Sequence, residues 1–270
     1  MIDFPNAKIN IGLHVVEKRT DGFHNIETVF YPIPLCDVLE IIVDEQLTFT
    51  NLGIEINAPA HENLCFKAYQ LLAQDFNLPP AKIVLQKLIP FGAGLGGGSS
   101  DAAFTIKILN QLFLLGISDA EMESYARKLG SDCAFFIKNE PVYAYNKGDE
   151  FAKIDLSLKN KKLLLIKPSI SIPTSVAYAE IKPQKGKIDL NELSTLPLVA
   201  WKDIIVNDFE FSVFKKYPEL NEIKKMLYNY GALYASMSGS GSCMYGIFEN
   251  DFYIDESTLP YQFSKLIELK

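Results

Sequence analysis

The beginning of the chain alternates apolar and polar residues. Ala7, Ile9, Ile11, Leu13 and Val15 alternate with Lys8, Asn10, Gly12 and His14. A period of two predicts a half-buried β-strand, because successive side chains of a strand point to opposite faces. The polar face of this strand would present Lys8, Asn10 and His14 together.

The same reading predicts the order of the other elements. Further strands are expected at residues 26–32, 38–43, 82–88, 134–137, 142–145 and 163–166. Helices are expected at residues 62–74, 102–115, 118–129 and 219–230. Two last strands, 233–237 and 244–248, would flank a polar glycine loop at 238–242. Strands and helices mix without a regular alternation, so the pattern favours an α+β fold over a doubly wound parallel sheet.

A change of pattern in the middle of the chain suggests two domains. A polar, charged stretch at residues 147–162 precedes a new apolar strand, and 270 residues suffice for two modest domains. We therefore expect an N-terminal domain at 1–155 and a C-terminal domain at 156–270.

Composition narrows the function classes. The formal net charge is −7, so a broad nucleic-acid or anionic-membrane footprint is not expected. The N-terminus lacks a basic region followed by an apolar stretch, and the sequence has no run of about 18 apolar residues, which predicts a cytoplasmic protein. Four cysteines lie far apart without metal-ligand spacing, which is typical of buried, reduced thiols.

Residues 89–103, IPFGAGLGGGSSDAA, are the most informative segment. Five of seven consecutive positions are glycine, between a predicted strand and a predicted helix. Glycine loses more conformational entropy on folding than other residues. So many glycines are therefore expected only where the backbone adopts positive φ or a ligand approaches closely. The free N–H groups and positive dipole end of a helix N-terminus favour an anion, so we expect phosphate here.

Other glycine-rich motifs fit this segment less well. A Walker A loop requires Lys where Gly98 stands. The dinucleotide fingerprint is matched by Gly92, Gly94 and Gly97, but Asp119 then falls at a helix start instead of a strand end. The glycine loop of protein kinases is accompanied by H-R-D and D-F-G motifs, which this sequence lacks. A glycine hinge without a ligand remains an alternative, although a hinge does not require Ser-Ser-Asp at a helix start.

Two charged residues are candidates for phosphoryl transfer, which needs a proton acceptor and a nearby cation. Asp132 lies in GSDCAFF, between a predicted helix end and an apolar strand. Lys8 lies on the first strand among apolar and small neighbours. By residue type alone, Asp132 is more often a turn residue and Lys8 a solvated lysine, but these surroundings favour function. The polar glycine loop at 236–242 is a further candidate, with a simple hairpin connection as the alternative.

The full glycine segment resembles the phosphate loop of the kinase superfamily that includes galactokinase, homoserine kinase, mevalonate kinase and phosphomevalonate kinase. Three more segments narrow the resemblance: PNAKINIGL, RTDGFHNIETVF and SISIPTSVAY. With GSDCAFF and SMSGSGS they are similar to the 4-diphosphocytidyl-2-C-methyl-D-erythritol kinases of the non-mevalonate isoprenoid pathway. The likeness covers nearly the whole chain, in the same order.

The resemblance implies a two-domain small-molecule kinase with its active site in the cleft between domains. Residues 1–155 would then be the N-terminal ATP-binding kinase domain and residues 156–270 the C-terminal kinase domain. It would transfer the γ-phosphate of ATP to the 2-hydroxyl of the methylerythritol moiety. Lys8 and Asp132 match the family's catalytic pair. A sister kinase acting on homoserine, mevalonate or a sugar is the first alternative, although those acceptors do not require the DGFH and SIPT segments. A catalytically silent nucleotide-binding sensor is the second, and it would not require both Lys8 and Asp132.

The resemblance also implies binding residues. Asn10 would contact the substrate, Phe23 and His24 would stack on and hydrogen-bond the cytosine, Tyr178 would face its other side, and Thr174 would lie near it. Asn63 and Leu64 would meet adenine. The phosphates would be lined by Pro90, Phe91, Gly92, Ala93, Gly94, Leu95, Gly96, Gly97, Gly98, Ser99 and Ser100.

Some positions depart from the family pattern. Many members have Tyr where Phe23 stands, GADVPFF where this chain has GSDCAFF, and Phe or another residue at Tyr178. No carboxylate ligand for Mg²⁺ is evident, so the metal is expected to be carried by the ATP phosphates, with protein contact near Ser100. The expected partner is a small molecule with a cytidine diphosphate group, with no nucleic acid or membrane, and the chain is expected to be a monomer or weak homodimer.

Overall fold

A computed structural model describes residues 1–56 and 59–270. Contacts divide the chain into two compact units, each assembled from separate segments. The first unit contains Met1–Lys8, Leu35–Phe91 and Gly96–Glu140. The second contains Ile9–Pro34, Gly92–Leu95 and Pro141–Lys270. The chain thus passes between the units several times, and the boundary at residues 155 and 156 stays a prediction.

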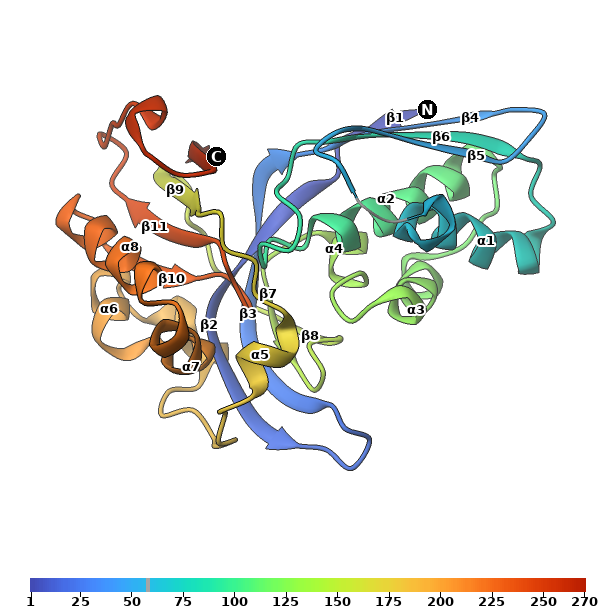
Figure 1. Cartoon of the computed structure of the whole chain (residues 1–270). Helices are drawn as coiled ribbons and strands as arrows, with labels where there is room; N and C mark the ends of the chain where they lie inside the picture. The colour runs from blue at the N-terminus through green and yellow to red at the C-terminus, as the bar shows by residue number, and fades with distance from the viewer. Residues whose placement is uncertain (57–58) are drawn as a thin grey trace. The chain divides into compact units, whose positions relative to one another are not determined.

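The first unit is built on a four-stranded sheet in the order β1-β4-β6-β5 (Figure 1). Its strands are β1 (Ile2–Asp3), β4 (Val38–Val43), β5 (Thr48–Gly53) and β6 (Ala81–Lys87). β4 and β6 are antiparallel, whereas β5 and β6 are parallel. Along β6 the buried positions alternate from Ala81 through Ile83 and Leu85 to Lys87. A lysine therefore occupies the last core position of this strand.

Helices complete the first unit. They are the 3₁₀ turn η1 (Ala60–Glu62), α1 (Leu64–Phe76), α2 (Gly97–Leu112), α3 (Asp119–Leu129) and α4 (Phe135–Lys138). α2 packs against α1, α3, α4 and the sheet. The side chain of Asn63 caps α1, and Ser118 with Glu121 forms a capping box at α3. These caps fix where the flanking helices begin, around the central α2.

The second unit contains two four-stranded sheets. One has the order β2-β3-β7-β8, from β2 (Asn6–Lys18), β3 (His24–Cys36), β7 (Val142–Tyr145) and β8 (Glu150–Lys153). The other has the order β10-β11-β9-β12, from β9 (Lys161–Lys167), β10 (Tyr234–Met237), β11 (Met244–Phe248) and β12 (Phe263–Leu269). All paired strands in the second sheet are antiparallel. The ends of β2 and β3 belong to the first unit.

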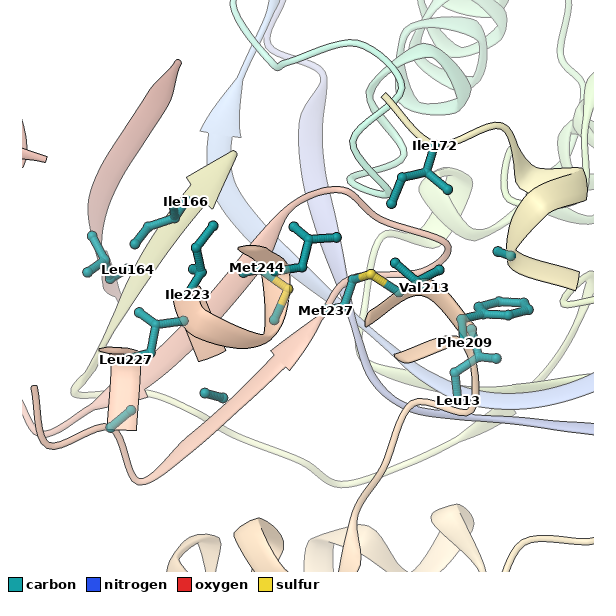
Figure 2. Close-up of a cluster of buried hydrophobic side chains, with 14 of the residues drawn as sticks. Leu13, Leu164, Ile166, Ile172, Phe209, Val213, Ile223, Leu227, Met237 and Met244 are labelled. Atoms are coloured by element: carbon teal, nitrogen blue, oxygen red, sulfur yellow. The ribbon is translucent and has the colours of Figure 1, made fainter. Parts of the chain in front are cut away.

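A hydrophobic cluster packs several helices of the second unit against the sheet that contains β9, β10 and β11. The helical elements here are α5 (Thr174–Tyr178), η2 (Leu190–Thr195), η3 (Leu198–Ala200), α6 (Trp201–Ile204), α7 (Phe209–Lys216), α8 (Pro218–Asn229) and η4 (Glu256–Thr258). Figure 2 shows Ile223 and Leu227 of α8 lying near Leu164 and Ile166 of β9. Met237 and Met244, at the facing ends of β10 and β11, belong to the same cluster. The cluster therefore anchors the ends of the loop that joins these two strands.

Three local expectations were wrong. Residues 134–137 do not form a strand: α4 occupies 135–138, because a short buried apolar run has no periodicity that separates helix from strand. α2 begins at Gly97, inside the glycine run, instead of at residue 102. The strand β2 is not half-buried, since Asn6 to Val15 are buried on both faces.

The remaining long elements lie where the patterns placed them.

The cysteines are free, with Cys65, Cys133 and Cys243 buried and Cys36 half-buried. Over the described residues, none of the helices combines the length and the apolar character that crossing a membrane would need.

Candidate active site

The N-terminus of α2 is the feature on which the candidate site is built. Gly96 precedes the helix with a φ of 70°, and no side chain caps the helix start. The first helical hydrogen bond runs from Ser100 N to Gly96 O, 2.9 Å apart. The N–H groups before Ser100 have no carbonyl partner within the helix. A 16-residue helix thus directs uncapped donors and its positive end toward one point, which suits an anion.

Leu64 and Ser100 lie at this helix start. A Cβ at Gly98 would be 3.8 Å from Leu64 Cδ1, so the start of α1 lies beside the glycine run. Asn63, the other residue predicted to meet adenine, accepts a hydrogen bond from Cys65 N at 2.8 Å. Ser100 Oγ is buried and has no hydrogen-bond partner in the described part of the chain. A buried hydroxyl that lacks a partner is costly, so a ligand atom would satisfy it.

Lys8 and Asp132 form an ion pair in the first unit. Their Nζ and Oδ2 atoms are 3.4 Å apart, and the two side chains are 3% and 30% exposed. Burial lowers the pKa of Lys8, and the charge of Asp132 opposes this effect. A Cβ at Gly96 would be 3.1 Å from Lys8 Cγ and Cε, so the lysine stem packs against the residue before α2. The structure therefore brings the predicted pair together next to the glycine run.

The first part of the glycine run, Gly92–Leu95, belongs to the second unit and packs against the loop after β10. Ser238 Oγ donates to Gly94 O at 2.8 Å, and Cys243 N donates to Ala93 O at 3.1 Å. A Cβ at Gly94 would be only 1.9 Å from Ser238 O. The two polar glycine loops identified in the sequence therefore lie in direct backbone contact.

Asn10 joins the same group of loops from β2. Its backbone N donates to Ser238 Oγ at 3.2 Å, and its Nδ2 donates to Thr28 Oγ1 at 3.1 Å. Tyr245 Oη donates to Asn10 O at 2.7 Å. Asn10 is thus held at the second glycine loop by main-chain and side-chain bonds.

The residues predicted to bind cytosine lie in the second unit. The rings of His24 and Tyr178 are stacked with centroids 4.6 Å apart. Phe23, the residue before His24, is 61% exposed. Burial and the charge of Lys18 lower the pKa of His24, so its imidazole is neutral at pH 7. Thr174 lies one helical turn before Tyr178, at the exposed start of α5.

The sequence did not reveal two groups that support these loops. Asn207 is buried and donates through Nδ2 to Met237 O and Gly239 O, each at 2.8 Å. Lys87, with two aspartates, lies beneath the start of α2. Nothing in the local sequence distinguishes Asn207 from an exposed turn residue. The alternation along β6 could have drawn attention to Lys87, because it places a charge on a core face.

Two family models match this chain, one in its N-terminal half and one in its C-terminal half. The model of the GHMP kinases N terminal domain matches residues 63–140, which include α1, the glycine run and Asp132. The model of the GHMP kinases C terminal region matches residues 189–256. The chain belongs to the GHMP kinase family. A 4-diphosphocytidyl-2-C-methyl-D-erythritol kinase of Bacteroides fragilis is 50% identical to it over 274 aligned residues, covering 100% of both chains.

Further relatives of this GHMP kinase carry the same name. The 4-diphosphocytidyl-2-C-methyl-D-erythritol kinase of Cytophaga hutchinsonii is 51% identical and covers 92% of each chain. A crystal structure of 4-(cytidine 5'-diphospho)-2C-methyl-D-erythritol kinase has a TM-score of 0.79 at 29% identity, covering 92% of this chain and 90% of its own. The crystal structure of the Methanococcus jannaschii mevalonate kinase has a TM-score of 0.68 at 18% identity, covering 93% of this chain and 92% of its own. The expected α+β two-domain kinase fold is confirmed.

The contact between the two glycine loops leads to a matched pair of substitutions. Gly92 and Gly94 both have positive φ, but a Cβ at Gly92 would have nothing within 4 Å. The kcat/KM for ATP of Gly94→Ala should therefore be about tenfold or more lower than that of Gly92→Ala, because overpacking typically costs about 1–3 kcal/mol. Steady-state kinetics, with circular dichroism to verify folding, measure the difference. Equal losses in the two variants would mean that backbone strain, and not the loop contact, matters.

Proposed function

We propose that this kinase transfers the γ-phosphate of ATP to the 2-hydroxyl of 4-diphosphocytidyl-2-C-methyl-D-erythritol, a step of the non-mevalonate isoprenoid pathway. The observation that carries the proposal is the ion pair of Lys8 and Asp132 at 3.4 Å, packed against Gly96 at the start of α2. Relatives that are 50% and 51% identical over most or all of the chain bear the name of this activity.

The reaction places a proton on Asp132. The acceptor hydroxyl oxygen attacks the γ-phosphorus, the bond between that phosphorus and the β,γ-bridging oxygen breaks, and ADP leaves. The hydroxyl proton passes to the Asp132 carboxylate late in the transfer. Asp132 suits this role because part of its side chain is exposed, whereas Lys8 behind it is buried.

Lys8 supplies a fixed positive charge. Its ammonium lies in a buried environment where charge interactions are stronger than in water. The ammonium lies 3.4 Å from the Asp132 carboxylate and can stabilise charge on the transferring group. The close contact between the Lys8 stem and Gly96 sets the distance between this charge and the phosphate loop.

The acceptor's cytosine is proposed to bind at the aromatic group of Phe23, His24 and Tyr178. A flat base gains stacking energy on such rings, and Phe23 is exposed. Burial and the charge of Lys18 lower the pKa of His24, which favours the neutral ring. A neutral ring offers one donor and one acceptor, which suits the mixed polar edge of cytosine. Asn10 and Thr174 would contact other parts of the acceptor.

Nucleotide binding is proposed at the start of α2. A kinase of this family uses ATP. The phosphates would accept hydrogen bonds from the first N–H groups of α2, and adenine would lie near Asn63 and Leu64. Mg²⁺ would neutralise charge on the β- and γ-phosphates, and the unsatisfied hydroxyl of Ser100 fits a role as its protein contact. A cytoplasmic location and a monomer or weak homodimer are also proposed, from the sequence.

A panel of acceptors tests the proposed function. ADP release is measured with Mg-ATP and, in parallel, the diphosphocytidyl substrate, mevalonate, homoserine and galactose. We expect turnover only with the diphosphocytidyl substrate, because only this acceptor offers a base to the aromatic group. Turnover confined to another acceptor would assign the protein to a sister kinase, and ATP binding without ADP release would indicate a sensor.

Asp132→Asn tests the proton acceptor. The amide keeps the size of the side chain but cannot take a proton, so kcat should fall at least about 10²-fold. Asp119→Asn is the matched control, because Asp119 is exposed at the start of the neighbouring helix α3, and its kcat should stay close to that of the wild type. A kcat near the wild-type value for Asp132→Asn would refute the assignment.

His24→Ala tests recognition of cytosine. We expect KM for the diphosphocytidyl substrate to rise about tenfold or more, since a hydrogen bond and a stacked ring are both lost, while KM for ATP stays unchanged. His24→Phe keeps a ring that can stack on Tyr178 and should give an intermediate KM. The assignment fails when both KM values rise equally in the two variants.

A further inference from the structure

A second charged cluster lies in the first unit, fully buried. Lys87 Nζ donates to Asp101 Oδ2 at 2.8 Å and also to Asp37 Oδ2. The side chains of Lys87, Asp37 and Asp101 are 1%, 0% and 3% exposed. Burying three charges is costly, and a hydrophobic group of similar volume is often as stable or more stable. The cost suggests that this cluster does more than stabilise the fold.

The cluster joins three segments that meet at the phosphate loop. Lys87 is the last residue of β6, Asp37 lies between β3 and β4, and Asp101 lies in the second turn of α2. Asp37 Oδ1 accepts hydrogen bonds from Leu88 N at 2.6 Å and Ile89 N at 2.8 Å. The chain that leads into the glycine run is therefore tied to the same cluster as the helix that leaves it.

Lys87 lies directly beneath the first residue of α2. A Cβ at Gly97 would be 2.8 Å from Lys87 Nζ and 2.9 Å from Ile89 Cγ2. Gly97 has an ordinary helical φ, so the lack of a side chain here serves this close approach and not an unusual backbone angle. The ammonium is thus in contact with the turn whose uncapped N–H groups form the candidate phosphate site.

The electrostatics of the cluster depend on Lys87. Asp101 Oδ1 has no hydrogen-bond partner within the described ranges. Without Lys87, two buried carboxylates would face each other under a site proposed for phosphates. The ammonium therefore both holds the helix start and offsets negative charge that would repel the nucleotide.

We infer that Lys87 is a positioning residue for ATP: through Asp37 and Asp101 it fixes the first turn of α2 in the conformation that binds the phosphates. The inference rests on the proposed phosphate site at this turn. Lys87 is only 1% exposed and lies against Gly97, so it would act through the helix start and not by touching the nucleotide. When the helix start is already ordered, binding of the nucleotide carries a smaller entropic cost. Nucleotide affinity should therefore depend on the cluster, whereas acceptor affinity should not.

Lys87→Met tests the inference with Lys82→Met as the matched control. Lys82 lies on the same strand but is exposed. The dissociation constant of a Mg-bound non-hydrolysable ATP analogue is measured by calorimetry, which needs no acceptor. We expect about a tenfold or greater loss for Lys87→Met and none for Lys82→Met, with KM for the acceptor unchanged. Unchanged analogue affinity in a folded Lys87→Met protein, or equal losses toward analogue and acceptor, would overturn the inference.

A neutral triple variant covers the case in which Lys87→Met does not fold. Lys87→Met combined with Asp37→Asn and Asp101→Asn leaves no unpaired buried charge, so its melting temperature should stay near that of the wild type. A folded triple variant with weakened analogue binding supports the positioning role. A folded triple variant with wild-type analogue binding shows a purely structural cluster. If the wild type binds the analogue but phosphorylates no diphosphocytidyl acceptor, the proposed function fails while this inference stands.

Discussion

The candidate site depends on a helix that begins without a cap. α2 starts in a run of glycines, so no side chain satisfies its first N–H groups. A neighbouring helix of the same unit, α3, starts with a complete capping box. The difference is chemical: a cap would occupy the donors that an anion needs. The glycines at the helix start carry no charged side chain. Positive charge comes instead from neighbouring residues: Lys8 packs against Gly96, and Lys87 lies beneath Gly97.

The two lysines that contact the start of α2 have opposite electrostatic settings. Lys8 pairs with one partly exposed carboxylate, and burial lowers its pKa. Lys87 is held by two buried carboxylates, and their charges raise its pKa despite burial. Lys87 is therefore fixed as a cation within a closed cluster, which suits a positioning role. Lys8, whose partner is open to solvent, suits a role beside reacting groups.

Close backbone contact is a second constraint on the site. The carbonyl of Ser238 occupies the space that a side chain at Gly94 would need. Asn207 donates hydrogen bonds to the carbonyls of Met237 and Gly239 in the same loop. The hydrophobic cluster of Figure 2 contains Met237 and Met244, at the two ends of this connection. The core of the second unit thus determines where the second glycine loop lies, and that loop supports the first.

The sequence by itself determined the long regular elements and the family, because these depend on local patterns such as the alternation of β2 and the length of the glycine motif. It also singled out Lys8 and Asp132, which the structure brings to 3.4 Å. It did not determine that residues 135–138 are helical or that α2 begins at Gly97, because a short apolar run and a run of glycines have no periodicity. Only the tertiary structure decided that Lys87 is buried with Asp37 and Asp101. These partners are 50 and 14 residues away along the chain, and a charge pairs with whatever lies close to it in space.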